Sequence, residues 1–180
     1  MKSVLVHSCC AHCAAYTVDY WRQQGYEVSA LWYNPNIHPY MEHQHRLKAM
    51  QSLAQEMSLP LIITEGYGII DYFRQVVGHE AQRCQYCLRL RLSKTAETAH
   101  QMGFSAFTTT LLISPHQKHD LIRETGNKLA EEKSVEFLYT DLRKHYSDSR
   151  RMTKGLELYR QQYCGCVYSE WERYTKITIV

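Results

Sequence analysis

Short apolar runs alternate with longer amphipathic segments along this chain. The apolar runs, rich in β-branched residues, predict strands at residues 3–7, 27–33, 61–63, 106–110 and 135–139. The amphipathic segments predict helices at residues 14–24, 41–57, 69–78, 84–102, 119–133, 147–162 and 169–174. Strands that alternate with helices are typical of a parallel sheet covered by helices on both faces. We therefore predict a single α/β domain over residues 1–180, with a Rossmann-like parallel sheet.

Chemically distinctive residues follow several of the predicted strands at the points where these strands end. Cys9, Cys10 and Cys13 come after the first strand, and Asp141 comes after the fifth. In open parallel sheets, ligands bind outside the carboxyl ends of the strands. We therefore expect the functional site, and any metal it holds, at this edge of the sheet.

The composition predicts a cytoplasmic protein without a membrane segment. Nowhere do 18 apolar residues follow one another, and the apolar run near the N-terminus is too short for a signal peptide. Thiols stay reduced in the cytoplasm, so the seven cysteines do not indicate a disulfide framework. The net charge of +3 permits an anionic partner without requiring one.

The seven cysteines fall into three tight groups, which indicates metal binding or redox chemistry. Cys84 and Cys87 have the Cys-x₂-Cys spacing that presents two thiolates to one metal centre. The group around Cys10 lies at the start of a predicted helix, whose dipole favours thiolates. Cys164 and Cys166 flank a glycine that permits a tight backbone.

Two other interpretations of the cysteines stay open. Free cysteines are often buried as small hydrophobic residues, although three tight groups argue against that for the whole set. A structural zinc site needs four ligands and commonly uses two Cys-x₂-Cys pairs, whereas this chain has one such pair and more thiols than zinc requires. The excess of thiols favours an iron–sulfur site with redox thiols beside it.

Phosphate-binding loops and strong basic patches are not evident in the sequence. There is no G-x-G-x-x-G and no Walker A sequence, which disfavours nucleotide use. Basic residues recur along the segment from Arg83 to Lys94, and Arg150, Arg151 and Lys154 form a second group. Both groups are more typical of solvated helix faces than of a nucleic-acid surface.

Five segments together resemble the QueH-type epoxyqueuosine reductases over nearly the whole chain. They are Ser8-Cys9-Cys10-Ala11-His12-Cys13, residues 33–40, Arg83-Cys84-Gln85-Tyr86-Cys87, residues 108–115, and residues 158–166 with Cys164-Gly165-Cys166 at their end. The chain departs from the family pattern at His12, where the family usually has proline, and the stretch before Cys84 is shorter than in the family.

The resemblance implies reduction of the epoxide of epoxyqueuosine at the tRNA wobble position, the final step of queuosine biosynthesis. It implies that Cys9, Cys10, Cys84 and Cys87 bind a [4Fe–4S] cluster. It also implies a redox-active pair in Cys164 and Cys166, and an additional mononuclear iron for which Cys13 and Asp141 are the candidate ligands. The partners implied are tRNA carrying epoxyqueuosine and an unidentified electron donor; no oligomeric state is predicted.

Several alternatives accompany these expectations. The chain could be a zinc- or iron–sulfur-bound tRNA-binding module without catalysis, or a tRNA thiolation enzyme, although the latter would need an ATP-binding loop. Asp141 could be a helix cap or turn residue rather than a ligand or proton donor. For tRNA binding we expect phosphate contacts from the basic residues nearest the cysteines and base stacking on aromatic neighbours: Arg83, Arg89, Arg91, Arg160, Tyr86 and Tyr163.

Overall fold

Five parallel strands form one sheet in the order β3-β2-β1-β4-β5 in the computed structural model, which describes residues 2–179. The central strand β1 pairs along its whole length with β2, from Ser3 opposite Glu27 to His7 opposite Leu31. On its other side β1 pairs with β4. The predicted Rossmann-like α/β fold is confirmed. The strands are β1 Ser3–His7, β2 Glu27–Trp32, β3 Leu61–Ile63, β4 Ala106–Thr109 and β5 Glu136–Phe137.

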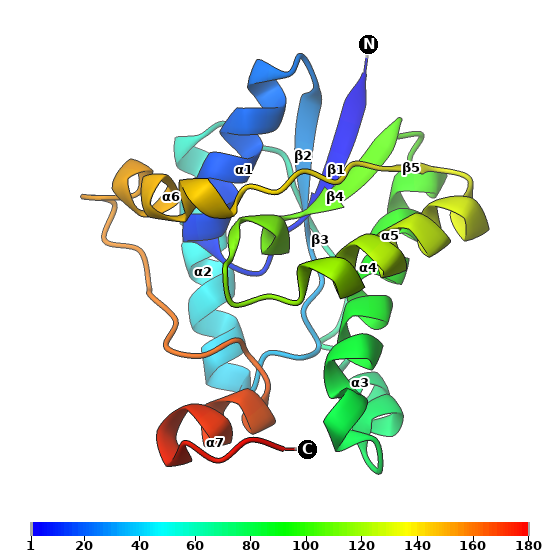
Figure 1. Ribbon diagram of the computed structural model, residues 1–180. Coiled ribbons are helices and arrows are strands. Elements are labelled where there is room, and N and C mark those ends of the chain that lie inside the picture. The colour runs from blue at the N-terminus through cyan, green and yellow to red at the C-terminus, as the bar shows by residue number, and fades with distance from the viewer. Residues whose placement is uncertain (1, 180) are drawn as a thin grey trace.

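Helices cover both faces of the sheet (Figure 1). On one face α1 packs against β2 and α2, and on the other α4 packs against β1, β4 and α5. No helix within residues 2–179 is both long and apolar enough to cross a membrane. The α-helices are α1 Ala11–Gln23, α2 Tyr40–Glu56, α3 Ile69–Val76, α4 Arg83–Gln101, α5 His119–Lys133, α6 Tyr146–Met152 and α7 Val167–Thr175, with short 3₁₀ helices at Glu80–Gln82, Thr110–Ile113 and Arg143–His145.

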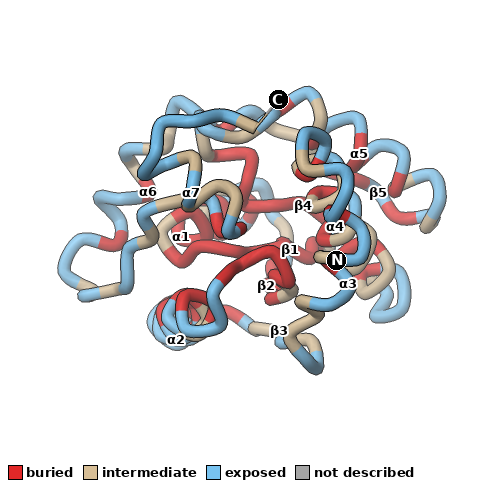
Figure 2. The backbone as a smooth tube through the Cα atoms, turned by 90° about the horizontal axis from the view of Figure 1, so that it is seen from below, coloured by how far each residue is buried: buried red, intermediate tan, exposed pale blue. Residues whose placement is uncertain are grey.

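The core lies along the central strands, as expected for a parallel sheet buried on both faces. Val4, Leu5 and Val6 are fully buried, and the buried backbone in Figure 2 runs through the strands while the outer helix faces are exposed. At the edge of the sheet, α5 approaches β5 so closely that a Cβ on Gly126 would lie 2.3 Å from the Phe137 ring. This close packing requires glycine at position 126.

The helix predicted over residues 147–162 is wrong in its second half. Helix α6 ends at Met152, and the following residues have no regular structure up to α7. Gly155 has φ of +93° and Glu157 has φ of +49°, and left-handed backbone of this kind stops a helix. A smaller difference is that α1 begins at Ala11, three residues before the predicted start.

The irregular segment brings the C-terminal part of the chain across the sheet. In Figure 1 the strands run downward from the N-terminus, and the segment after α6, drawn orange to red, passes below the ends of the strands to α7. It therefore lies at the edge of the sheet where the sequence places the first cysteine group.

Candidate active site

The first cysteine group lies where β1 passes into α1. Cys10 is the N-cap residue of α1, and Cys9, Cys10 and Cys13 are all buried. The Cys9 Sγ atom is 3.9 Å from Oγ1 of Thr110, which begins the turn after β4. Because β1 and β4 lead to helices on opposite faces, a crevice opens between their ends, and ligands bind in such crevices.

The three thiols of this group differ in how readily they ionise. The pKa of Cys10 is lowered to about 7 by the neighbouring Cys13 thiol, with help from the amide groups of Cys13 and His12 and from the Arg46 guanidinium. The Cys13 pKa is raised by the Cys10 thiol and by burial. Burial also raises the pKa of Cys9 to about 11. Cys10 is therefore the thiol in this group that most readily becomes a thiolate.

The second group, Cys84 and Cys87, lies in the first two turns of α4. Residues three apart share one helix face, so both thiols point to the same side. Burial raises the pKa of Cys84, and it raises that of Cys87 to about 12. Cys164 and Cys166 lie close enough that the charge of their thiolates raises both pKa values further. Next to them, Arg83 Nη2 is 2.5 Å from Glu172 Oε2, which ties α4 to α7.

Arg91 places a buried positive charge among the thiols. Its side chain is 2% exposed, and none of the ion pairs within residues 2–179 gives it a carboxylate partner. Burial alone would lower its pKa, but the thiols of Cys87, Cys9 and Cys164 together raise it above its ordinary value. A buried cation is costly unless negative charge lies nearby. In turn, the Arg91 charge lowers the pKa of Cys9 and Cys87 and so opposes the larger effect of their burial.

The third group, Cys164 and Cys166, is fixed to the body of the protein by hydrogen bonds from two buried residues, Arg46 and His38. Arg46 on α2 donates through Nη1 to the Cys164 carbonyl at 2.8 Å and through Nη2 to the Tyr163 carbonyl at 3.0 Å. The His38 amide donates to the Gly165 carbonyl at 2.8 Å. Gly165 has φ of +158°, and a Cβ there would lie 3.1 Å from Nδ2 of Asn36, so the backbone conformation and the tight space both favour glycine at this position.

Arg46 is itself held by Glu42, so we expect a large loss of stability when it is replaced. The Nε atom of Arg46 lies 2.7 Å from Glu42 Oε1, and both side chains are almost fully buried. Arg46→Met would leave Glu42 buried without its partner and should lower the free energy of unfolding by about 3 kcal/mol. Urea denaturation measures this. The double variant Arg46→Met/Glu42→Gln should recover part of the loss, and equal stability of the single and double variants would contradict this account.

The two thiols of the third group have different surroundings. Cys164 is exposed and accepts a hydrogen bond from Gln117 Nε2 at 3.5 Å. Cys166 is buried, accepts from the Ser169 amide at 3.3 Å and packs against Tyr72. All seven cysteines are free thiols. The arrangement therefore presents one accessible and one protected sulfur of the same pair.

A cavity of about 570 Å³ joins the first and third cysteine groups. Thiols, hydroxyls, amides, aromatic rings and three arginines line it: Cys9, Cys10, Cys13, Thr110, Leu111, Ser114, His116, Gln117, Tyr146, Arg150, Arg160, Gln161, Gln162, Tyr163, Cys164, Ser169 and Arg173. Cys84 and Cys87 are not part of this lining, although both are near enough to Cys164 for its charge to raise their pKa. The cavity has the volume of a typical small-ligand site.

Nowhere within residues 2–179 do three Cys, His, Asp or Glu side chains come together as ligands of a single metal ion. The thiolates of an iron–sulfur cluster bind separate irons, so they lie farther apart than the ligands of one ion. The predicted cluster, the additional iron and the assignment of their ligands therefore stay predictions.

Asp141 lies outside the cavity lining. Its carboxylate is 42% exposed, pairs with the Arg143 guanidinium and accepts from the Arg143 amide at 3.1 Å. The side-chain and amide hydrogen bonds from Arg143 lower the pKa of Asp141 well below its usual range. This placement is that of a turn residue, which was the alternative role, and a role as an iron ligand remains a prediction.

Three of the four arginines expected to contact tRNA phosphate are engaged elsewhere. Arg83 pairs with Glu172, Arg89 pairs with Glu132, and Arg91 is buried among thiols. Of that set, Arg160 alone lines the cavity, where Arg150 joins it. The sequence alone treated Arg150 as part of a solvated helix face, and its proximity to Arg160 arises from the irregular segment after α6.

Comparisons with known proteins agree with the resemblance seen in the sequence. The family profile described as "Epoxyqueuosine reductase QueH" matches residues 4–172. A Dehalococcoides mccartyi protein named "Epoxyqueuosine reductase QueH" is 53% identical over 173 residues, covering 96% of this chain and 95% of that protein. A Thermotoga maritima protein of the same name is 33% identical over 186 residues, covering 98% and 94%.

Among solved structures, the fold is similar to one titled as a predicted subunit of tRNA methyltransferase from Methanocaldococcus jannaschii. The TM-score is 0.56 at 14% identity, covering 82% of this chain and 76% of the other. At this identity the similarity shows the fold alone.

Proposed function

This chain belongs to the epoxyqueuosine reductase QueH family, and from that premise we propose how it reduces the epoxide of epoxyqueuosine at the tRNA wobble position to give queuosine. The chain is an epoxyqueuosine reductase, an oxidoreductase that acts on tRNA. One observation carries the proposed mechanism: three cysteine groups, far apart in the sequence, meet at one edge of the sheet, beside a cavity of about 570 Å³.

We assign the cluster ligands to the first two groups. Cys9, Cys10, Cys84 and Cys87 would hold a [4Fe–4S] cluster between the end of β1 and the start of α4. The residues fit this group because Arg91 lies buried beside Cys9 and Cys87 with no carboxylate partner among residues 2–179, and a cluster held by thiolates would supply negative charge there. When bound, the cluster would supply single-electron transfer, and the polarising of a C–O bond would fall to an additional iron with an open position.

The additional mononuclear iron remains part of the proposal. Support for Cys13 as a ligand comes from its thiol, which is next to that of Cys10 and lines the same cavity. Asp141 would first have to exchange its pairing with Arg143 for the metal. Of the two candidate ligands, Cys13 therefore has the stronger support.

Cys164 and Cys166 would supply the electrons and protons of the reduction. Removing the epoxide oxygen as water and leaving a C=C bond takes two electrons and two protons. Oxidation of the two thiols to one disulfide releases both, so atoms and electrons balance. A disulfide between residues two apart is strained and hence readily reduced. An external dithiol would attack Cys164, the exposed sulfur, and restore the pair.

The cavity suits a single base from an anticodon loop. Sequence-specific RNA recognition usually takes unpaired bases, which stack on aromatic rings and are read at their edges. Tyr146, Tyr163 and His116 offer such rings in the lining, and Gln117 and Gln162 offer amides. Arg150, Arg160 and Arg173 add positive charge for the backbone.

The experiment is conversion of tRNA bearing epoxyqueuosine by anaerobically reconstituted protein with dithiothreitol and a low-potential chemical reductant, without ATP. Mass spectrometry of the digested nucleosides should show queuosine in place of epoxyqueuosine. Persistence of epoxyqueuosine with a fully loaded cluster would contradict the function. Family membership does not favour the alternatives, a binding module without catalysis or a thiolation enzyme, and neither predicts this product.

A further inference from the structure

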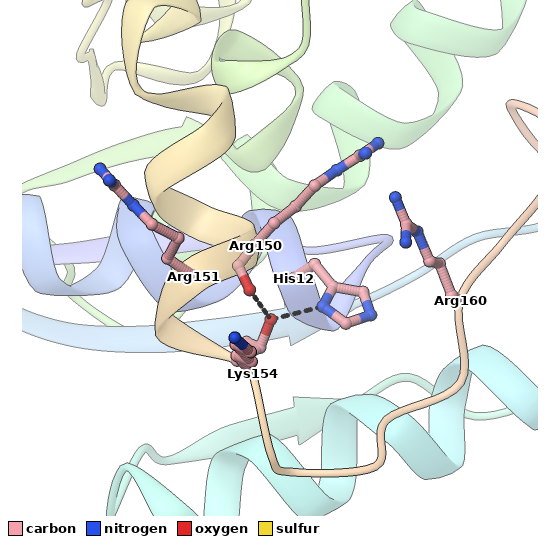
Figure 3. Close-up of a pocket in the computed structure, with 6 residues that line it drawn as sticks. His12, Arg150, Arg151, Lys154 and Arg160 are labelled. Carbon is pink, nitrogen blue, oxygen red and sulfur yellow. Dashed lines mark hydrogen bonds between the residues drawn. The ribbon is translucent and has the colours of Figure 1, made fainter.

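A second hollow, of about 300 Å³, lies next to the cysteine cavity and is strongly basic (Figure 3). Its lining consists of His12, Arg150, Arg151, Thr153, Lys154 and Arg160. These residues come from the start of α1, from the end of α6 and from the irregular segment that follows. Arg150 and Arg160 extend toward each other above His12, whereas Arg151 points away from them.

The positive charges at this hollow are largely unpaired. Arg151 is held by Asp148, but among the ion pairs of residues 2–179 there is no carboxylate partner for Arg150, Lys154 or Arg160. Arg150 is oriented by Tyr146, whose hydroxyl is 2.6 Å from Nη2 and whose ring lies under the guanidinium. Three cations that have no ion-pair partner in the described part of the chain surround one hollow, which indicates an anionic ligand, and guanidinium groups suit phosphate oxygens.

The base of the hollow is a built structure rather than a mobile surface. His12 Nδ1 is 2.6 Å from Thr153 Oγ1, and the same hydroxyl lies 3.2 Å from the Ser149 carbonyl. Thr153 and Ser149 are buried, so α1 and the end of α6 are joined through His12.

The hollow and the cysteine cavity share two walls, because Arg150 and Arg160 line both. A nucleotide whose base enters the cysteine cavity therefore has its backbone at the basic hollow. We propose that this hollow binds one of the two backbone phosphates that flank the wobble nucleotide, with Arg150, Lys154 and Arg160 as its ligands. The assignment of the base to the cavity rests on the proposed function.

The test uses the double variant Lys154→Gln/Arg160→Gln and anticodon stem-loops in which one flanking phosphate is replaced by a neutral methylphosphonate. With unmodified stem-loop, the variant should bind roughly tenfold more weakly than the wild type, because charge-assisted hydrogen bonds are lost. The slope of log Kd against log salt should fall by about 0.7. At one of the two positions, methylphosphonate should weaken binding to the wild type roughly tenfold and weaken binding to the variant clearly less, because the variant keeps only Arg150 of the three ligands.

Lys128→Gln is the matched control, because Lys128 is an exposed lysine of α5 that pairs with Glu124 and lies in neither cavity. It should bind like the wild type. The visible spectrum of each loaded protein monitors folding and cluster content. The proposal is overturned if methylphosphonate costs the variant as much affinity as it costs the wild type at both positions, or if the double variant binds like the control.

The two proposals fail separately. If the variant shows the expected loss but the wild type forms no queuosine, the phosphate site stands and the assigned reaction is wrong. If the wild type forms queuosine but the variant binds and turns over like the control, the reaction stands and the phosphate site is wrong.

Discussion

Cys84→Ser and Cys87→Ser are each expected to yield a colourless protein without detectable reductase activity. A hydroxyl is a poor iron ligand at neutral pH, so the loss of either thiolate leaves the cluster with an open corner. Both residues lie near the start of α4, which the Arg83–Glu172 ion pair holds against α7. The apoprotein should therefore keep its secondary structure, which circular dichroism would verify.

The measurement is visible absorption together with iron and sulfide content after anaerobic reconstitution. Serine at Cys164 or Cys166 provides the matched control, because the same substitution is then made in a neighbouring cysteine group outside the proposed ligand set. Full cluster content in Cys84→Ser and Cys87→Ser would remove both residues from the ligand set.

Cys164→Ser and Cys166→Ser should keep the cluster and lose turnover. The pair lies on a loop fixed by Arg46 and His38, apart from the turns that carry the proposed cluster ligands. Without either thiol no disulfide forms, so the two electrons and two protons of the reduction have no source within the protein.

A thiol titration measures this prediction directly. Without external dithiol, the wild type should lose two thiols for each queuosine formed, since one disulfide balances one epoxide reduced. Each serine variant should form no queuosine and keep its remaining thiols. Loss of the cluster in either variant would instead identify that cysteine as a ligand. Turnover at the wild-type rate would contradict the proposal that Cys164 and Cys166 supply the electrons.

The fold was predictable to a large extent because its strands are short, apolar and separated by amphipathic helices. Helix α5 matches its predicted bounds, and β1 does too. The prediction failed over residues 153–162, where no proline interrupts the helical pattern. There the left-handed backbone at Gly155 and Glu157 accompanies packing against the site, which a local pattern does not encode.

The cysteine groups were predictable because rare residues recur at tight spacings. The residues that hold these groups in place were not predictable. Arg46 and Glu42 read as an ordinary pair four residues apart on a helix surface, yet both are buried and hold the loop of Cys164. The only indication of this buried role in the sequence was that Glu42 and Arg46 are four residues apart on a helix face that is otherwise buried. Tyr72 packs against Cys166, but nothing in the sequence around Tyr72 indicates this contact.

The positions of the basic residues were likewise not predictable from their spacing in the sequence. Arg91 belongs by spacing to a charged helix face, but it is buried beside Cys87. Arg150 and Arg160 are ten positions apart on what the pattern predicts as one helix, and only the end of that helix at Met152 brings them to one cavity. Tertiary placement, rather than local composition, decides which arginines can meet tRNA.

The central claim, that the grouped cysteines hold an iron–sulfur cluster, is tested most directly by metal and sulfide analysis of the wild-type protein purified without oxygen. The account predicts a brown protein with about four irons and four acid-labile sulfides per chain, and about one further iron if the additional site is filled. A colourless protein that holds stoichiometric zinc and no sulfide after the same preparation would contradict it.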